Sequence, residues 1–567
     1  MAGNGQSRWI VVTLVWLVIF GLGAVAFRFV VQPWMTESSR RTELLTEYEQ
    51  LSAVAAERGL PAVSLPEDAD AGQIATAVGD LKQRLTGAAP LPPAGDAATV
   101  AVALDSFSGY CLWRSPALRK QLAAGHITLE LVDDGADYPR RMRALKSGKT
   151  PLAVFTVDAL IKASADLGQM PGTIVMLIDE TIGADAMVAY ESAIPNIDAL
   201  NSPNARIVTT RHSPSETLAR VVMANFRLPE LADEPWIDAD GAADVLRRFQ
   251  QADRTGPNVF VLWEPYVTRA LAEDGAHVLM DSSRFRGYIV DVLVAQRDYL
   301  IDHEPVVRAI VEAYQRVAYE QRRGADGMAA LVFDDARRSG EKLSRKQAQD
   351  LVERIWWKTT QENYTHMGVA SDAAASDLQP LHEMIRNITA VLLRTGAITA
   401  DPAGGNPPSL YYDRVLRSMH EANFHPALIR PSAQAAAGNG AAPAPDIAAL
   451  SDPQWAQLRP VGTLRVERII FARGTARLTR QSQRALDQLA QTLRSWPQYY
   501  LQVHGHARRE GDPQANRQLA QARADMARTF LIDKGTDPHR VKVIRSEPRD
   551  NGGQAQSVTF VLGQTPY

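Results

Sequence analysis

The sequence has a single cysteine, Cys111, among 567 residues. One thiol cannot form a disulfide within the chain and leaves no Cys-rich metal site. We expect Cys111 to be a small, buried apolar residue. The chain also lacks an excess of charge of either sign. Its formal net charge of −3 gives no reason to expect nucleic-acid binding.

Catalytic motifs are missing as well. No Ser/His/Asp, Cys/His or paired-carboxylate arrangement has a suitable spacing, and there is no phosphate-binding loop or dinucleotide fingerprint. His504 and His506 alternate on one predicted strand, but two histidines alone are a weak metal site. We therefore expect no enzyme activity, no cofactor and no metal. The apolar fraction of 46% and charged fraction of 22% are ordinary for globular domains, and the length predicts three or four of them.

One long apolar run is present, from Ile10 to Phe27, and it contains no charged residue. At about 1.5 Å per residue it covers most of a hydrocarbon core of roughly 30 Å, which predicts a transmembrane helix. Trp9 and Trp34 suit the two membrane interfaces. The alternative is a cleaved signal peptide, but the run is longer than usual and no small-x-small site follows it. We expect residues 1–34 to be an uncleaved anchor.

Residues 35–99 are predicted to form a helical stalk and a linker. Leu44, Tyr48, Leu51 and Ala55 recur at helical spacing, which suits a short coiled coil, packing on a neighbouring domain, or a plain stalk. The segment from 65 to 99 is rich in Ala, Gly, Pro and Asp, with one short helix expected near 74–85.

Residues 100–431 begin with alternating strands and helices. Apolar runs at 100–105, 127–134, 151–156 and 173–181 are separated by helical segments, which predicts an open, mostly parallel sheet. In such sheets ligands bind at the carboxyl ends of the strands, where helix N-termini present free N–H groups.

The segments VALDSFSGY, LRKQLAAGHITLELVDDG and NARIVTTRHSPSETLARVVM resemble, in order and spacing, the nitrate/sulfonate/taurine type of periplasmic solute-binding protein that serves ABC importers. The resemblance implies an α/β two-lobed periplasmic-binding-protein fold of type II over 100–431. Its second lobe would span about 186–288, and a helical extension would follow at 324–431. A small ligand, such as an anion or a sulfonate, would be bound by hinge closure.

The same resemblance implies a set of cleft residues from both lobes: Ser106, Ser108, Gly109, Tyr110, Phe155, Thr156, Ser213, Ser215, Thr217, Trp263, Glu264 and Tyr266. Each has an alternative. The sequence from Ser213 to Glu216 is also a helix-capping box, which uses the same N–H groups as anion binding. The aromatic residues near 265 could simply be core. Acidic residues at the predicted strand ends, Asp133, Asp134, Asp179 and Glu180, leave a cationic or zwitterionic ligand open.

Residues 432–457 have a low-complexity composition and are predicted to be a flexible linker. The segment from 458 to 567 resembles the OmpA-like domain that binds peptidoglycan, which implies a small α+β fold. Asn516 and Arg523 match that family's peptide-binding positions. The family's aspartate is replaced by Arg508, which would repel the amine of the peptide and weaken binding. Glu510 or Asp512 could replace the missing carboxylate.

Together these features predict a multidomain, single-pass inner-membrane protein with most of its chain in the periplasm. The flanking charges do not decide the orientation, which rests on the two resemblances. The predicted function is a receptor for a small ligand, in transport or envelope sensing, with peptidoglycan and a membrane protein as partners. The alternative is a ligand-free scaffold that links the inner membrane to the cell wall through protein contacts.

Overall fold

We describe the protein from a computed structural model. The residues that it describes are 41–42, 44–52, 65–66, 69–85, 98–324, 327–339, 343–370, 378–426, 448–506, 511–545 and 558–565. None of the helices within these ranges is long and apolar enough to cross a membrane. The predicted anchor at 10–27 lies outside them. The chain forms two units, 1–92 with 421–430 and 93–420 with 431–567, which we describe separately.

The described part of the first unit has a small helical core. Helix α3 (Ala71–Leu85) begins after Asp70, whose carboxylate accepts a hydrogen bond from the Gln73 N–H at 2.8 Å. Apolar side chains of α3 and of the helical stretch before it pack together, namely Leu51, Ile74, Val78 and Leu81 with Leu44, Leu45 and Tyr48 at their edge. The predicted stripe at 44–51 therefore packs against α3 of the same chain.

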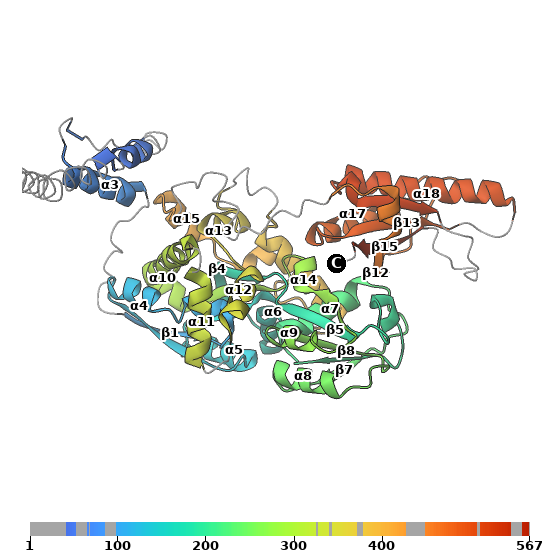
Figure 1. The fold of residues 1–567 in the computed structure, drawn as a ribbon, viewed down its shortest axis with the longest axis horizontal. Coiled ribbons are helices and arrows are strands. Elements are labelled where there is room, and N and C mark those ends of the chain that lie inside the picture. Colours follow the sequence, from blue (N-terminus) through green and yellow to red (C-terminus); the bar gives the residue numbers. More distant parts are fainter. Residues whose placement is uncertain are drawn as a thin grey trace, which may run out of the picture. The chain divides into compact units, whose positions relative to one another are not determined.

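The second unit begins with a first lobe built on a six-stranded sheet in the order β11-β4-β10-β3-β1-β2 (Figure 1). Its strands are β1 (Ala98–Leu104), β2 (Ile127–Asp133), β3 (Leu152–Thr156), β4 (Gly172–Thr181), β10 (Val290–Gln296) and β11 (Ile355–Trp357). The first three strands run parallel, whereas β10 lies antiparallel between β3 and β4. The accompanying helices are η2 (Ser108–Leu112), α4 (Pro116–Ala123), α5 (Tyr138–Lys146), α6 (Val157–Leu167) and α10 (Arg297–Arg323).

Local sequence sets the bounds of these helices. Ser115 and Asp137 cap α4 and α5 with their side chains, and a proline follows in the first turn of each helix. Helix α6 ends at Gly168, which adopts a left-handed conformation with φ of 69°. Every residue of β3 and β4 is buried, as expected for central strands covered on both faces.

The second lobe is a five-stranded sheet in the order β7-β6-β8-β5-β9. Its strands are β5 (Asp185–Tyr190), β6 (Arg206–Thr209), β7 (Trp236–Asp238), β8 (Asn258–Trp263) and β9 (Ala276–Asp281), and its helices are η3 (Ile197–Leu200), α7 (Pro214–Asn225), α8 (Gly241–Gln251), α9 (Tyr266–Ala270) and η4 (Ser282–Arg284). The chain crosses between the lobes at 182–184 and returns at 282–289. Ser282 ties the two crossings together, since its hydroxyl accepts from the Gly183 N–H at 2.8 Å. The chain thus forms two lobes, each built on its own sheet and joined by two crossings.

The extension after α10 completes the first lobe. It comprises α11 (Gly327–Ser339), α12 (Arg345–Glu353), β11, α13 (Thr360–His366), α14 (Leu381–Arg394), η6 (Pro407–Leu410) and α15 (Arg414–Glu421). Its residues form hydrogen bonds with backbone groups along the outer edge of β4. The amide of Asn363 bonds both backbone groups of Leu177, at 2.7 and 3.0 Å, and the Tyr412 N–H donates to the Ile174 carbonyl at 2.8 Å. The extension therefore closes an otherwise open sheet edge.

The C-terminal domain is a four-stranded sheet in the order β12-β15-β13-β14 with helices packed on it (Figure 1). Its elements are α16 (Asp452–Ala456), β12 (Arg459–Thr463), α17 (Arg480–Ser495), β13 (Tyr500–Gly505), α18 (Pro513–Asp533), η8 (Pro538–Arg540), β14 (Val541–Arg545) and β15 (Val558–Gln564). Strand β13 is antiparallel to β15 and parallel to β14. A side chain at Gly505 would collide with the Ala520 carbonyl, so glycine lets α18 lie directly on β13.

Candidate functional site

A row of side chains crosses the first-lobe sheet. Strand register pairs Trp357 of β11 with Asp179 of β4, Asp179 with Asp291 of β10, and Asp291 with Thr156 of β3. Directly paired residues in a sheet point to the same face, so these four side chains form a line across four strands. All four are buried. The row joins Thr156, predicted from the sequence, to two carboxyl groups and a tryptophan that were not assigned to the cleft.

The turn at 106–110 packs over this row. The Tyr110 hydroxyl donates to Asp291 Oδ1 at 2.5 Å, and Trp357 Nε1 donates to the Gly109 carbonyl at 2.8 Å. A Cβ atom at Gly109 would lie 2.7 Å from Asp179 Oδ2, so only glycine allows this approach. Phe155 lies beneath in the core, Ser108 is half-buried and Ser106 is exposed.

The two neighbouring carboxyl groups are hard to ionise together. Burial raises the pKa of Asp179 to about 7. Burial and the adjacent Asp179 raise the pKa of Asp291 well above its usual value. Apart from the Asp291 carboxyl group, no described donor forms a hydrogen bond with either carboxylate oxygen of Asp179. Two carboxyl groups in such a place favour sharing a proton over carrying two charges.

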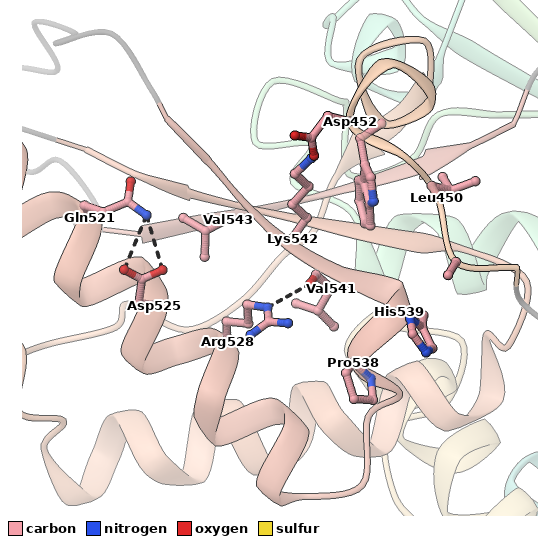
Figure 2. A pocket seen from close by; sticks show the side chains of 12 residues that line it. Leu450, Asp452, Gln521, Asp525, Arg528, Pro538, His539, Val541, Lys542 and Val543 are labelled. Carbon is pink, nitrogen blue, oxygen red and sulfur yellow. Dashed lines mark hydrogen bonds and ion pairs between the residues drawn. The ribbon is translucent and has the colours of Figure 1, made fainter.

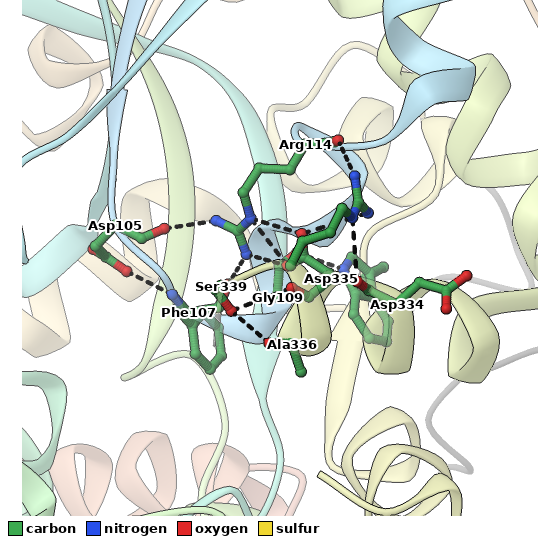
Figure 3. Close-up of polar contacts among 10 residues, drawn as sticks. Asp105, Phe107, Gly109, Arg114, Asp334, Asp335, Ala336 and Ser339 are labelled. Atoms are coloured by element: carbon green, nitrogen blue, oxygen red, sulfur yellow. Dashed lines mark hydrogen bonds and ion pairs between the residues drawn. The ribbon is translucent and has the colours of Figure 1, made fainter. Parts of the chain in front are cut away.

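Two arginines hold the ends of the first-lobe strands. Arg141 is fully buried and donates to Asp105 Oδ2 at 3.0 Å and to Asp134 Oδ1 at 2.5 Å. Arg114 donates to the carbonyls of Asp105 and Phe107, each at 2.7 Å, and to Asp335 of α11 at 2.6 Å (Figure 3). The extension therefore fixes the turn at 106–110 from outside.

The opposite face of β4 carries a buried ion pair. Lys358 Nζ lies 2.6 Å from Glu180 Oε2, and the two side chains are 0% and 2% exposed. The Gly287 N–H donates to Glu180 Oε1 at 2.7 Å. Burial alone would raise the pKa of Glu180, but the Lys358 ammonium outweighs it and the pKa is lowered. The pair anchors β11 and the returning crossover to β4.

The two lobes meet where α6 and α7 begin. The Thr217 hydroxyl of α7 donates to Asp158 Oδ2 of α6, and Lys162 Nζ lies 3.2 Å from the same carboxylate oxygen. Ser215 donates to Asp185 Oδ1 at 2.6 Å. Burial raises the pKa of Asp185 to about 7. We call Asp158, Lys162, Ser215 and Thr217 the interlobe cluster.

The N-terminus of α7 already carries a carboxylate of its own chain. Ser213 caps the helix by accepting from the Glu216 N–H. Glu216 in turn accepts from the His212 N–H and pairs with Arg220 at 2.6 Å. Burial would raise the pKa of Glu216, but Lys162 and Arg220 outweigh it and lower the pKa to about 2. The Ser213 cap predicted from the sequence is present, but Glu216 accepts from His212 and not from the Ser213 N–H, so the predicted capping box is only half formed. Glu216 places a negative charge beside the helix N-terminus.

Several polar atoms around the interlobe cluster are buried without a hydrogen-bond partner among the described residues. They come from both lobes and are Thr156 Oγ1, Asp158 Oδ1, Lys162 Nζ, Thr209 Oγ1 and Thr210 Oγ1. Buried polar groups are normally hydrogen-bonded, so such a group of atoms needs an explanation. The sequence pattern does not single out Asp158 and Lys162, although their spacing of four places both on one face of α6.

Three residues predicted to line the cleft contact residues outside the interlobe cluster. Glu264 forms an ion pair with Arg354 and accepts from the Thr268 N–H at 3.1 Å. Trp263 and Tyr266 pack against the second-lobe core, which is the alternative that the sequence left open. The structure therefore brings Ser215, Thr217 and Thr156 toward the lobe contact and gives the segment at 263–266 other partners.

In the C-terminal domain, Arg523 lies on α18. Its Nε donates to the Thr475 carbonyl at 3.0 Å, and its guanidinium lies 5.1 Å from the centre of the Phe471 ring. Asn516 is in the first turn of α18, which Asp512 caps. The predicted Arg508 lies outside the described residues. Among those described, there is no group of three or more His, Cys, Asp or Glu side chains suited to a metal ion.

A groove of about 420 Å³ lies elsewhere on this domain (Figure 2). Gln521, Asp525 and Arg528 of α18 line it together with Lys542 of β14. The Arg528 Nε donates to the Val541 carbonyl at 2.9 Å, and Lys542 pairs with Asp452 at 2.5 Å. These α18 positions are spaced by four and three residues and share a helix face that does not include Arg523.

Comparison with known proteins identifies part of the chain. Residues 470–556 match the OmpA family. A 78-residue stretch is 33% identical to the peptidoglycan-associated lipoprotein of Brucella melitensis and 36% identical to that of Mesorhizobium japonicum. Each alignment covers 14% of this chain and 46% of the relative. The chain thus spans less than half the length of these curated relatives.

The two-lobed part has similar solved structures. The periplasmic aliphatic sulphonate binding protein of Escherichia coli is 15% identical, with a TM-score of 0.41 over 56% of this chain and 92% of that chain. The periplasmic nitrate-binding protein of Synechocystis PCC 6803 is 9% identical, with a TM-score of 0.42 over 58% and 89%. Residues 470–556, which follow the two lobes, form a domain of the OmpA family.

Proposed function

We propose that this is a cell-envelope protein that attaches to peptidoglycan through its OmpA-family domain and binds a small solute between its two lobes. A membrane anchor at 10–27 would tether it to the inner membrane, with most of the chain in the periplasm. The curated relatives of residues 470–556 are peptidoglycan-associated lipoproteins, which supports the cell-wall part. The solute-binding part is argued from the interlobe cluster.

The observation that carries solute binding is the gathering of unpartnered polar atoms where the lobes meet. Thr156 Oγ1 comes from the first lobe, Thr209 Oγ1 and Thr210 Oγ1 come from the second, and all three hydroxyl oxygens are buried. A buried hydroxyl without a partner costs free energy, so a polar ligand held there would be bound by groups already in place.

The charges around the cluster favour a particular ligand chemistry. Lys162 and the N-terminus of α7 attract negative charge, whereas Asp158 and Glu216 repel it. A simple anion, which the resemblance implied, would meet both effects. A zwitterionic or uncharged polar ligand, such as an amino acid or a polyhydroxylated molecule, would match the mixed charges better.

Thermal shift and native mass spectrometry of the full-length protein would test solute binding. The panel would contain small anions, sulfonates, amino acids and sugars. A zwitterion or neutral polar molecule is expected to stabilise the protein, and the shift should vanish in Thr217→Val. Thr492→Val on α17 of the OmpA-family domain is the matched control, and its shift should equal that of the wild type. An unliganded mass together with no shift across the panel would contradict a receptor.

A scaffold that binds no solute is the second candidate, and a specific observation favours it. The Glu216 carboxylate accepts a hydrogen bond from the His212 N–H next to the start of α7. Trp357 donates a hydrogen bond to the Gly109 carbonyl above the row of side chains on the first-lobe sheet. Groups of the chain thus already use positions that a ligand would need. In that case the two lobes would serve as a surface for protein partners between membrane and wall.

Peptidoglycan attachment is tested separately. Purified cell-wall sacculi should sediment the protein, and Arg523→Ala should weaken this by removing a guanidinium suited to a peptide carboxylate. Arg528→Ala changes the same residue type on another face of α18 and should sediment as the wild type does. Equal sedimentation of all three would contradict a peptidoglycan site at Arg523. The effect of Arg508 on binding stays a prediction, tested by Arg508→Asp, which should strengthen sedimentation.

A further inference from the structure

The C-terminal domain, residues 448–565, contains the OmpA-family match and contacts the second lobe through backbone hydrogen bonds; we call this whole domain the OmpA-family domain below. The Arg227 N–H donates to the Thr463 carbonyl at 2.9 Å, and the Arg465 N–H donates to the Asn225 carbonyl at 2.7 Å. Phe226 and Leu464 form an antiparallel β-bridge between the two. The end of β12 therefore runs alongside the residues that end α7, as a short two-stranded pairing would.

A carboxylate strengthens this pairing. Asp198 of η3 accepts from the Thr463 N–H at 2.8 Å and from the Thr463 hydroxyl at 3.0 Å. The first of these bonds uses a backbone donor at the end of β12, so Asp198 satisfies a group that strand pairing leaves open.

Aromatic rings fill the centre of the contact. Phe226 and Trp496 are both 0% exposed, and their rings stack at 5.6 Å between centroids with an interplanar angle of 18°. A Cβ atom at Gly462 would lie 2.8 Å from the Phe226 ring and 3.1 Å from Ile197. Only glycine permits this approach, so the shape of β12 is fitted to the second lobe. Stacked, fully buried rings are typical of the centre of a stable interface.

A second stretch of the OmpA-family domain reaches the returning crossover. The Arg286 N–H donates to the Ser495 carbonyl at 2.6 Å. The Tyr499 hydroxyl donates to the Met280 sulfur at 2.9 Å, and Arg284 Nη1 donates to Gln498 at 3.3 Å. We call residues 495–499 the docking loop. It touches the segment that joins the second lobe back to the first.

The docking loop is held in shape from within its own domain. Arg540 is buried and donates to the carbonyls of Leu493, Trp496 and Tyr499, with distances of 3.2 Å to the first and 3.0 Å to the last. A planar guanidinium that binds three carbonyls fixes the loop without help from the lobe. Such a preformed loop loses little conformational entropy on docking.

We propose that the OmpA-family domain and the second lobe move as one rigid body, so that any rotation between the lobes turns the cell-wall domain with it. Helix α7 connects the two ends of this body, because Thr217 near its start meets the first lobe and Phe226 at its end meets Trp496. Twelve helical residues span about 18 Å. If the solute binding proposed above is right, solute and wall attachment would affect each other reciprocally; the docking itself does not depend on it.

Cross-linking tests the docking in the full-length protein. Asp198→Cys with Thr463→Cys places two thiols where the side chains now touch, while the native Cys111 is buried with 0% exposure. Mild oxidation or a short bismaleimide should join them in high yield, seen by peptide mapping. Each single variant is a control with no partner thiol. Asp198→Cys with Thr475→Cys places the second thiol beside Arg523 instead. A cross-link no more frequent than in this mispaired control would overturn the docking.

Distance measurements test the rigid-body movement. Spin labels at Gln250→Cys on the second lobe and Gln491→Cys on α17 should give one narrow distance distribution. Gly462→Leu places a branched side chain against Phe226 and should broaden it, while sedimentation with sacculi shows that the domain is still folded. A broad distribution in the unmodified background, or a narrow one that Gly462→Leu leaves unchanged, would overturn the proposal.

A test of the coupling between the lobes and the OmpA-family domain needs a third labelled position. A label at Lys120→Cys on the first lobe is paired with Gln250→Cys or with Gln491→Cys, and Asp158→Ala is used to loosen the contact between the lobes. Both distributions measured from 120 should change together, while the 250 to 491 distance stays fixed. A change in the 120 to 250 distance without one in the 120 to 491 distance would overturn the coupling. Neither outcome requires a solute, so the result does not bear on the proposed receptor function.

Discussion

Replacing Lys358 with methionine should expose how much the first lobe depends on its buried ion pair. The two side chains are 0% and 2% exposed, and Nζ lies 2.6 Å from Glu180 Oε2. Methionine fills most of the space of the lysine side chain but leaves the Glu180 carboxylate buried with the Gly287 N–H as its hydrogen-bond donor. Breaking one partner of a buried pair costs about 3–5 kcal/mol. We expect a loss of that size in the free energy of unfolding at pH 7.5.

The loss should depend on pH in a defined direction. In the wild type the pKa of Glu180 is lowered, because the Lys358 ammonium outweighs the effect of burial. That stabilisation is present above the unfolded pKa of about 4.3 and is lost as the pH falls through the folded value. Without Lys358, burial remains and the pKa of Glu180 rises above 4.3. The deficit of the variant should therefore shrink as the pH falls from about 7.5 toward 5.

Urea unfolding followed by tryptophan fluorescence at several pH values measures both effects. The double variant Glu180→Leu with Lys358→Met is the control, because removing both charges avoids a buried unpaired carboxylate and should recover most of the stability. A Lys358→Met variant within about 1 kcal/mol of the wild type at pH 7.5, or a deficit that grows on acidification, would refute the reasoning.

Three further outcomes are expected. Burial raises the pKa of Asp179 to about 7, so the contribution of Asp179 to stability falls as the pH rises from its unfolded pKa toward 7. Asp179→Asn should therefore flatten the decline in Tm between pH 5.5 and 8. An unchanged slope in differential scanning fluorimetry would contradict this. Asp335→Ala removes the carboxylate that holds Arg114 and should lower the free energy of unfolding in urea by about 1–3 kcal/mol. Asp334→Ala, at the exposed neighbouring residue, should leave it within about 0.5 kcal/mol of the wild-type value. Equal effects of the two substitutions would count against the contact. Burial also raises the pKa of Cys111, so a thiol reagent should label it in urea and leave it unlabelled in the native protein, where rapid labelling would show that the site opens.

The local pattern of the sequence predicts much of the fold. The expected strands at 100–105, 127–134, 151–156 and 173–181 agree with β1 to β4 within two residues, because each is a short apolar run between turn or helix signals. The OmpA-like segment is confirmed by the family match at 470–556. The capping at Ser213 is visible in sequence because its partners lie within three residues.

Contacts between distant segments could not be predicted in the same way. Strand β10 is not among the expected strands, yet it places Asp291 between Thr156 and Asp179. Trp357 reaches Gly109 across 248 positions. Strand order and register of this kind depend on tertiary packing, and a single sequence has no periodicity that reports it. The sequence therefore identifies the turn at 106–110 but not the carboxyl groups beneath it.

The way the extension covers β4 determines where this protein can be cut. A fragment that ended after α10 would leave ten fully buried residues, Gly172–Thr181, as an open edge strand, without the backbone partners that Lys358, Asn363 and Tyr412 supply. Long apolar edges of this kind pair with other chains and aggregate. A soluble version of the two lobes should therefore be truncated after α15 and not after α10.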